Sequence, residues 1–210
     1  MSKQTRERIL ETSLVLFNER GEPNVTTNHI ADELGISPGN LYYHYRNKDD
    51  IVEQLFARYE ARMDQALLVP DGRLPNLEDV WMQLHLVFEC MWTFRFLYRD
   101  LVDIVSRNRK LKQHFSRILT RASTSATQVL KGLAQAEILR ATQDEIRATA
   151  ENVLLVTTFW LSYNTVRGGR SDTSQEDLTH GIYQVMLLIA PFLRDAERLH
   201  LNTLAQAYRR

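Results

Sequence analysis

Cysteine, glycine and proline are scarce in this chain: its 210 residues include one cysteine, eight glycines and five prolines. A single thiol, Cys90, excludes an internal disulfide framework and suits a reducing compartment. No apolar run approaches the roughly 20 residues that span a bilayer, and the start, MSKQTRERIL, carries no apolar signal segment. We therefore expect a soluble, cytoplasmic protein with no membrane contact.

An excess of charge of either sign is also missing. The chain carries 26 basic and 26 acidic residues, so its net charge is zero. The stretch 1–48 is balanced as well, with basic residues at 3, 6, 8, 20, 46 and 48 and acidic residues at 7, 11, 19, 22, 32 and 33. Any binding to nucleic acid must therefore depend on where the charges point and not on their number.

Motifs for catalysis and metal binding are absent. No glycine-rich phosphate loop and no G-x-S-x-G nucleophile motif occurs. His85 and Glu89 are one helical turn apart, with Cys90 adjacent, but a metal site needs three or four converging ligands. His114, His180 and His200 have no matching spacing. We expect no catalytic residues, no metal, no cofactor and no enzymatic activity.

Helical periodicity, by contrast, runs through the whole chain, and no alternating strand pattern or internal repeat interrupts it. The expected helices cover residues 5–20, the stretch 26–48, and then 49–68, 77–94, 96–106, 108–135, 148–166, 178–193 and a tail to 210. Two prolines and a glycine in 69–76 (VPDGRLPN) predict a hinge, and Gly168-Gly169 begins a loop. Pro191 is expected to kink or end the helix that contains it.

The stretch from Thr26 to Lys48, TTNHIADELGISPGNLYYHYRNK, has the pattern of two short helices joined by a tight turn. Thr26 and Ser37 are suitable N-caps, and Pro38 stands where a first helical residue needs no N–H. Gly35 suits the left-handed residue that commonly ends a helix. Together these signals predict a helix-turn-helix motif.

Several residues of this stretch are placed to contact DNA. Asn40 can bond a base edge, Gly39 allows close backbone approach, and Lys48 can reach a phosphate. The predicted DNA-binding residues are Thr27, Asn28, Ser37, Pro38, Gly39, Asn40, Tyr42, Tyr43, His44 and Lys48. Adjacent helical residues point about 100° apart, so one of Tyr42 and Tyr43 can instead join Tyr45 in the core. We favour Tyr42 as the outward residue.

Three segments, RERILETSLVLFNERG, VTTNHIADELGIS and PGNLYYHYRNKDDIV, resemble the TetR family of bacterial transcriptional regulators. The resemblance covers roughly residues 1–55, and the remainder is similar only in being helical. NERGEPNVTT, GISPGNLYYHY and FRFLYRDLVDIVSRN further resemble a subgroup that includes regulators of polyhydroxyalkanoate storage, which implies an acyl-type effector. The expected fold is all-α: an N-terminal three-helix bundle with a helix-turn-helix at 1–48, and a larger helical effector-binding and dimerisation domain at 49–210.

Two late helices, 148–166 and 178–193, are apolar on all sides and are the best candidates for a homodimer interface; the alternative is that both are central core helices. Aromatic residues suggest an apolar pocket, although such stripes are more often core. The candidate ligand-binding residues are Phe88, Trp92, Phe96, Tyr98, Phe115, Thr157, Trp160 and Tyr163.

The favoured reading is a homodimeric repressor of a palindromic double-stranded DNA operator, released by a small apolar or amphipathic effector. The effector would favour the state in which the two helix-turn-helix motifs of the dimer are wrongly spaced for the operator. The alternative is a helical small-molecule-binding protein or enzyme whose helix-turn-helix contacts proteins. Binding to DNA in a gel shift separates the two, and an activator stays open within the regulator class.

Overall fold

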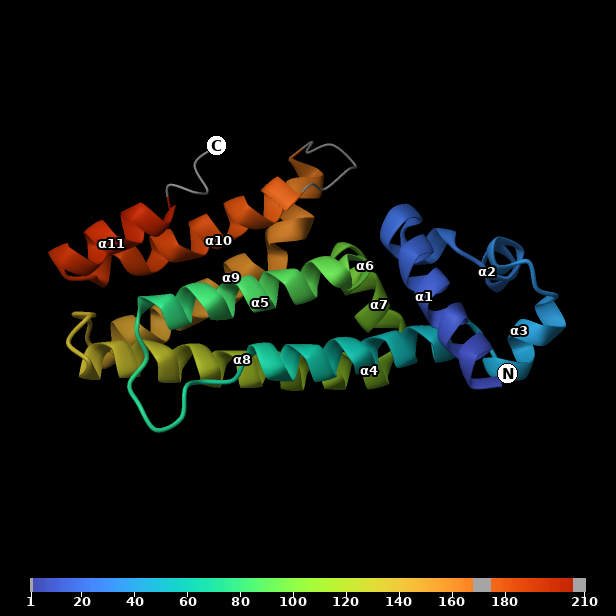
Figure 1. The fold of residues 1–210 in the computed structure, drawn as a ribbon, viewed down its shortest axis with the longest axis horizontal. Coiled ribbons are helices and arrows are strands. Elements are labelled where there is room, and N and C mark those ends of the chain that lie inside the picture. The colour runs from blue at the N-terminus through green and yellow to red at the C-terminus, as the bar shows by residue number, and fades with distance from the viewer. Residues whose placement is uncertain (1, 168–174, 206–210) are drawn as a thin grey trace. The chain divides into compact units, whose positions relative to one another are not determined.

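A computed structural model describes residues 2–167 and 175–205 of the chain, and these residues are almost entirely helical (Figure 1). Within them no strand forms, and the one extended contact is an isolated antiparallel bridge between Leu139 and Leu193. The predicted all-α fold, with an N-terminal helix-turn-helix and a larger helical remainder, is confirmed. The loop expected at Gly168-Gly169 lies outside the described residues.

Two compact units divide the chain. The first contains residues 1–62 and 94–114, and the second contains 63–93 and 115–210. The segment 69–76, expected as a hinge between two parts, instead lies wholly within the second unit, whose chain begins at residue 63, inside the preceding helix. The division of function at residue 48 remains a prediction, because compactness alone does not assign roles.

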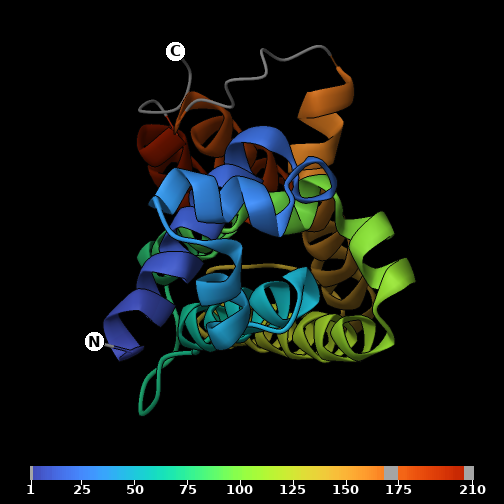
Figure 2. The ribbon, with the colours of Figure 1, turned by 90° about the vertical axis from the view of Figure 1, so that its right-hand side faces the viewer.

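The first unit is built on the helix-turn-helix and on a segment from the middle of the chain. Its elements are α1 (Ser2–Arg20), the 3-10 turn η1 (Glu22–Asn24), α2 (Thr27–Leu34), α3 (Pro38–His44), most of α4 (Lys48–Ala66), α6 (Arg95–Arg99), α7 (Leu101–Arg107) and the start of α8 (Arg109–Gln135). Figure 2 presents α1, α2 and α3 toward the viewer. The prediction of a single helix at 96–106 is wrong, because α6 and α7 are separate helices.

Aromatic packing holds α6 in the first unit. The rings of Phe17 and Phe96 have centroids 5.4 Å apart, and the hydroxyl groups of Tyr59 and Tyr98 are 2.5 Å apart. Asn18 Oδ1 accepts a hydrogen bond of 3.1 Å from the backbone N–H of Phe96. A segment from the middle of the sequence is therefore part of the same core as α1 and α4.

The second unit has its core among α5 (Leu77–Thr93), the rest of α8, α9 (Gln143–Val166) and α10 (Gln175–Ile189). The turn η2 (Ala190–Phe192) and α11 (Asp195–Ala205) follow. Helix α10 packs against both α9 and α5. The expected end of a helix near Pro191 is confirmed, because α10 gives way at Ile189 to a 3-10 turn that contains this proline.

Helix α9 begins five residues before the predicted start at 148. Thr142 Oγ1 accepts the N–H of Glu145, and the Glu145 carboxylate accepts the N–H of Thr142 at 2.7 Å. This reciprocal capping box satisfies the first free amides of the helix and fixes its start. Because the Thr142 N–H donates to this carboxylate, the pKa of Glu145 is lowered from its usual value.

Gly181 marks the closest approach of α10 to its neighbours. A Cβ atom at this position would lie 2.5 Å from a ring carbon of Phe88 and 2.7 Å from the indole of Trp160. Real Cβ contacts do not occur at such distances, so only glycine lets α10 lie this close to α5 and α9.

Gly181→Ala should therefore destabilise the protein by about 1–3 kcal/mol, the usual cost of overpacking a core. Chemical denaturation measures the loss. Gly39→Ala is the matched control, because a Cβ at Gly39 meets nothing within 4 Å. Equal stability of the two variants would contradict the close packing of α10.

Candidate nucleic-acid interface

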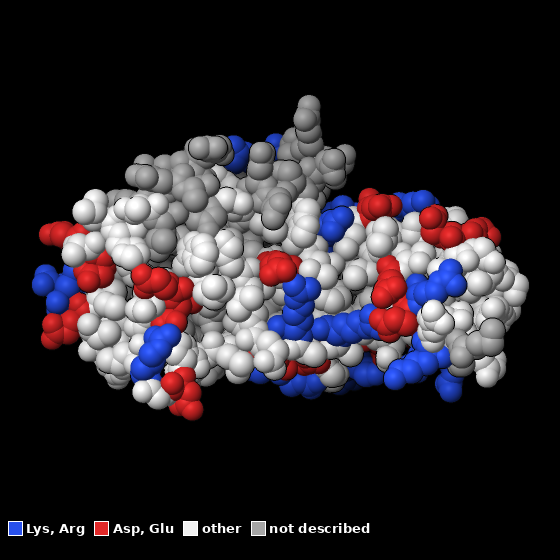
Figure 3. Space-filling view, viewed as in Figure 1, with Lys and Arg blue, Asp and Glu red and all other residues white. Residues whose placement is uncertain are grey.

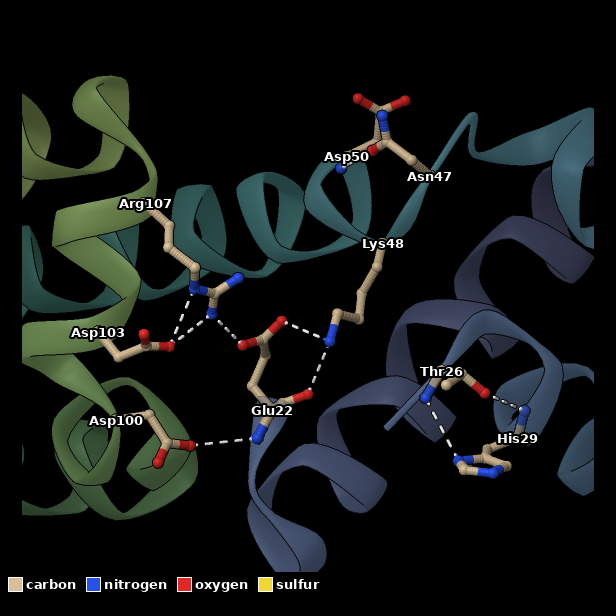
Figure 4. A network of polar contacts seen from close by, with 9 residues as sticks. All are labelled: Glu22, Thr26, His29, Asn47, Lys48, Asp50, Asp100, Asp103 and Arg107. Atoms are coloured by element: carbon tan, nitrogen blue, oxygen red, sulfur yellow. Dashed lines mark hydrogen bonds and ion pairs between the residues drawn. The ribbon is translucent and has the colours of Figure 1, made fainter. Parts of the chain in front are cut away.

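The start of α2 is fixed by a capping box of unusual composition. Thr26 Oγ1 accepts the N–H of His29 at 3.2 Å, and His29 Nδ1 accepts the N–H of Thr26 at 3.3 Å (Figure 4). Histidine thus fills the place that Glu or Gln usually takes. The predicted cap at Thr26 is confirmed, and the role of His29 was missed because an imidazole is not part of the usual pattern.

The turn and the start of α3 also follow the prediction. Gly35 ends α2 with φ 65° and ψ 34°, in the left-handed region that favours glycine. Ser37 Oγ accepts the N–H of Asn40 at 3.2 Å, and Pro38 is the first residue of α3. Asn47 Oδ1 accepts the N–H of Asp50 at 2.8 Å and so caps α4. Local hydrogen bonds therefore set the angle between the two short helices.

The two short helices bury one face and expose the other. Ile30, Ala31, Leu41 and Tyr45 are buried. Among the predicted DNA-binding residues, Asn28, Ser37, Pro38, Gly39, Asn40, Tyr42 and Tyr43 are exposed, whereas Thr27, His44 and Lys48 are half-buried. Tyr42 is 48% exposed and Tyr43 is 79% exposed, so neither belongs to the core. Tyr42 points outward, as favoured, and Tyr43 does so as well.

A hydrogen bond connects the two helices across their outer side. The hydroxyl of Tyr42 lies 2.9 Å from Thr27 Oγ1. Beside it, the rings of Tyr43 and His44 meet edge to face, with centroids 5.1 Å apart. These contacts orient aromatic and hydroxyl groups that can donate to phosphates or pack on a base methyl.

Gly39 has no role in the packing of this unit. A Cβ built there would have no heavy-atom neighbour within 4 Å, and its φ lies outside the left-handed range. A glycine inside a helix nevertheless costs stability relative to alanine. The open space over Gly39 leaves room for a close approach from outside the chain.

Lys48 is held by a partner that the sequence did not reveal. Its Nζ donates to the Glu22 carbonyl oxygen at 2.9 Å and lies 2.9 Å from Glu22 Oε1 (Figure 4). The contact with Oε1 is an ion pair without hydrogen-bond geometry, so after the bond to the carbonyl oxygen two N–H donors of the ammonium remain for further acceptors. The side chain of Lys48 is 24% exposed, whereas that of Glu22 is 1% exposed. The sequence analysis included Glu22 only as part of NERGEPNVTT, a segment that resembles a subgroup of regulators, and did not predict its contact with Lys48.

Charges on the surface are mixed, as the composition indicated. On the face drawn in Figure 3, acidic and basic side chains lie interspersed. Ion pairs account for some of this pattern in the first unit: Arg58 with Glu7 at 2.5 Å, and Lys110 with Glu53 at 2.5 Å. The Arg58 guanidinium lowers the pKa of Glu7, and Lys110 lowers that of Glu53.

The candidate ligand-binding residues are divided between the units. Phe96 and Tyr98 are buried in the first unit, with the ring contacts given above. Phe88, Trp92, Phe115, Thr157, Trp160 and Tyr163 belong to the second. There Phe88 and Trp160 pack on Gly181, and Phe115 is buried. Thr157 Oγ1 is buried without a hydrogen-bond partner in the described residues.

Part of α9 and α10 is exposed and apolar, which the sequence did not distinguish because both helices were expected to be apolar all round. Leu155, Phe159, Tyr163 and Val166 are 58%, 45%, 54% and 88% exposed, and all lie on α9. A groove of about 440 Å³ is lined by Leu155, Val156, Phe159, Trp160, Tyr163, Arg167, His180, Gln184 and Leu188. We call this the α9–α10 groove.

Metal ligands do not gather anywhere in residues 2–167 and 175–205: these contain no group of three or more His, Cys, Asp or Glu side chains that could hold an ion. In the faint pattern noted above, His85 Nδ1 lies 2.9 Å from the carbonyl oxygen of Trp81, and Cys90 is buried. Among the described helices, none combines the length and apolar character that crossing a membrane requires.

Two capped helices around a tight turn, with an exposed second helix, define a helix-turn-helix protein. Family models agree over most of the chain: residues 9–55 match "Bacterial regulatory proteins, tetR family", and residues 58–201 match "Bacterial transcriptional repressor" of the TetR type. The chain belongs to the TetR family.

Individual relatives support the assignment. A TetR-family transcriptional regulator from Marinobacter aquaeolei VT8 is 39% identical, with a TM-score of 0.89, over 98% of this chain and 99% of that one. HTH-type transcriptional regulators of Staphylococcus aureus are 42% identical over 57 residues, which is 27% of this chain and 31% of theirs. The SmeT–triclosan complex shares the fold, with a TM-score of 0.63 at 20% identity over 92% and 94% of the two chains.

Gly39→Ala should weaken specific DNA binding by about tenfold or more. The new methyl group contacts no protein atom, and we expect it to collide with the DNA backbone. Stability should be unchanged or slightly raised, since alanine favours a helix. Fluorescence anisotropy with operator DNA and thermal melting give the two values. Full DNA affinity in Gly39→Ala would show that nothing approaches this face of α3.

Proposed function

We propose that the protein is a homodimeric, DNA-binding transcriptional repressor, which a small apolar or amphipathic effector releases from its operator. The observation that carries this proposal is the outer side of α3, where Asn40, Tyr42 and Tyr43 are exposed on a helix fixed at both ends. Such a helix fits the major groove, and its N-terminal residues meet base edges.

DNA binding would combine two kinds of contact. Asn40 reads a base edge, while Thr27, Asn28, Ser37 and Lys48 fix the unit on the phosphate backbone. Pro38 and Gly39 keep the start of α3 slim, and Tyr42, Tyr43 and His44 supply hydroxyl, ring and imidazole contacts. Because the net charge is zero, placed contacts rather than a general basic surface supply the affinity.

A second copy would cover the α9–α10 groove. Helix-turn-helix proteins read two half-sites about one turn of DNA apart, which requires a two-fold dimer. The exposed apolar residues of α9, and all residues of the groove except Arg167, lie in the segments 148–166 and 178–193, which the sequence analysis favoured for pairing. Apolar surface of this kind is costly to leave in water and marks an interaction site.

The effector belongs in the second unit, and its class is apolar or amphipathic. Thr157 Oγ1, buried without a hydrogen-bond partner among the described residues, is available to orient one polar group of such a molecule. Ligands of proteins that share the fold at low identity include triclosan and choline. The fatty-acyl type rests on the resemblance to storage regulators, and mass spectrometry of a co-purified ligand tests it.

The protein should bind a palindromic site near its own gene, and its affinity should fall steeply as salt rises. Each neutralised phosphate contributes about −0.9 to the slope of log affinity against log salt. Gel shifts with native upstream DNA at several salt concentrations provide the test, with shuffled DNA of equal length as control. Equal binding to both DNAs would remove the proposed function.

Phe159→Glu should convert the dimer to the monomer of 24.5 kDa, because it places a charge in the apolar interface. Analytical ultracentrifugation measures the mass. Val102→Glu is the matched control, since Val102 is apolar and 72% exposed but lies on α7 in the first unit. A dimeric Phe159→Glu protein would place the interface elsewhere.

A further inference from the structure

A buried carboxylate joins three elements of the first unit. Glu22 belongs to η1, and its side chain is 1% exposed. Figure 4 shows this carboxylate between two cations, the ammonium of Lys48 at the start of α4 and the guanidinium of Arg107 at the end of α7. The distances are 2.9 Å from Oε1 to Lys48 Nζ and 2.6 Å from Oε2 to Arg107 Nη2.

A second contact, made by the backbone of Glu22, attaches the segment of α6 and α7 to this residue. Asp100, between α6 and α7, accepts the N–H of Glu22 on its Oδ2 at 3.1 Å. Burial raises the pKa of the Asp100 carboxyl, and this hydrogen bond opposes the rise. The stretches NERGEPNVTT and FRFLYRDLVDIVSRN, noted separately in the sequence, are therefore in direct contact.

The division of charge in this network bears on Lys48. Glu22 is one negative charge shared by two positive ones, and Asp103 balances part of Arg107 through a contact of 2.9 Å to Nε. Asp103 is 52% exposed, so water screens that contact more than it screens Glu22. Because Arg107 takes part of the Glu22 charge, Lys48 is oriented by Glu22 without being fully neutralised.

We propose that Glu22 and Arg107 are positioning residues for a phosphate contact made by Lys48. Glu22 holds the ammonium through its carbonyl oxygen and through the negative charge of its carboxylate, and leaves N–H donors for DNA, while Arg107 keeps enough positive charge on Lys48 for that contact. The strength of the Lys48–phosphate contact therefore depends on the position in which α7 holds Arg107. This inference rests on the DNA-facing role of Lys48 in the proposed function.

A buried carboxylate must be paired, so without Arg107 the Glu22 carboxylate would pair with Lys48 alone. The positive charge of Lys48 would then be more fully neutralised. Arg107→Met should therefore weaken operator binding by about two- to fivefold, the scale of one partly exposed ion pair. The salt slope should fall as well, by up to about 0.9. Arg107→Lys should restore most of the affinity, because it returns the charge to the same place.

The decisive experiment measures operator affinity for Arg107→Met in two backgrounds, the natural chain and Lys48→Met. We expect the loss in the natural chain only, because the effect passes through Lys48. The same loss in both backgrounds would show that Arg107 acts through its long-range charge, and would overturn the inference. So would an unchanged affinity of Arg107→Met in the natural chain.

Arg58→Met is the matched control: Arg58 is 37% exposed, pairs with Glu7 in the same unit and is not among the partners of Glu22 and Lys48 described above. It should leave operator affinity within about twofold. Should Lys48→Met itself bind as tightly as the natural chain, the assigned phosphate contact fails; the proposed repressor function would then be judged by the gel shift alone.

A second variant keeps the test informative if Arg107→Met is poorly folded, which thermal melting reveals. Asp103→Asn changes an exposed side chain and releases Arg107 to pair more fully with Glu22. Operator binding should become about two- to threefold tighter in the natural chain and should not change in Lys48→Met. Tightening in both backgrounds, or in neither, would contradict the assignment.

Discussion

The satisfaction of free backbone amides at the starts of α2 and α3 is the constraint on which the exposed surface of the helix-turn-helix depends. Thr26 with His29, and Ser37 with Pro38, meet this need within the motif itself. The left-handed Gly35 then fixes the turn between the two helices. Because local groups fix both helices, most side chains on the outer face of α3 are not needed to hold the motif together, and the Tyr42–Thr27 hydrogen bond is the exception.

Glu22 extends this local order to a distant part of the chain. Its N–H and its carboxylate are bound by Asp100 and Arg107, so the middle of the sequence becomes part of the unit that carries the helix-turn-helix. The buried charge is tolerated because two cations face it. The position of Lys48 and the attachment of α7 thus depend on one carboxylate.

The sequence predicted those features that depend on neighbours in the chain. The caps at Thr26 and Ser37, the turn at Gly35 and the end of α10 near Pro191 were all local, and the structure confirms them. The start of α9 was missed although the Thr142–Glu145 pattern was legible. The contact of Asp100, the residue between α6 and α7, and the pairing of Lys48 could not be predicted, because both are made with Glu22, which is 78 and 26 residues away in sequence from Asp100 and Lys48. The sequences of α9 and α10 likewise do not predict which side of each apolar helix stays exposed.

The charge balance of the chain has a consequence for how such a regulator finds its site. Non-specific attraction to DNA grows with the number of phosphates that a protein neutralises, and a genome offers about 10⁶–10⁹ competing sites. A chain with equal numbers of acidic and basic residues, also within residues 1–48, has no general excess of positive charge to add to this attraction. Fewer molecules are then held on irrelevant DNA, so a modest specific affinity suffices to occupy one operator.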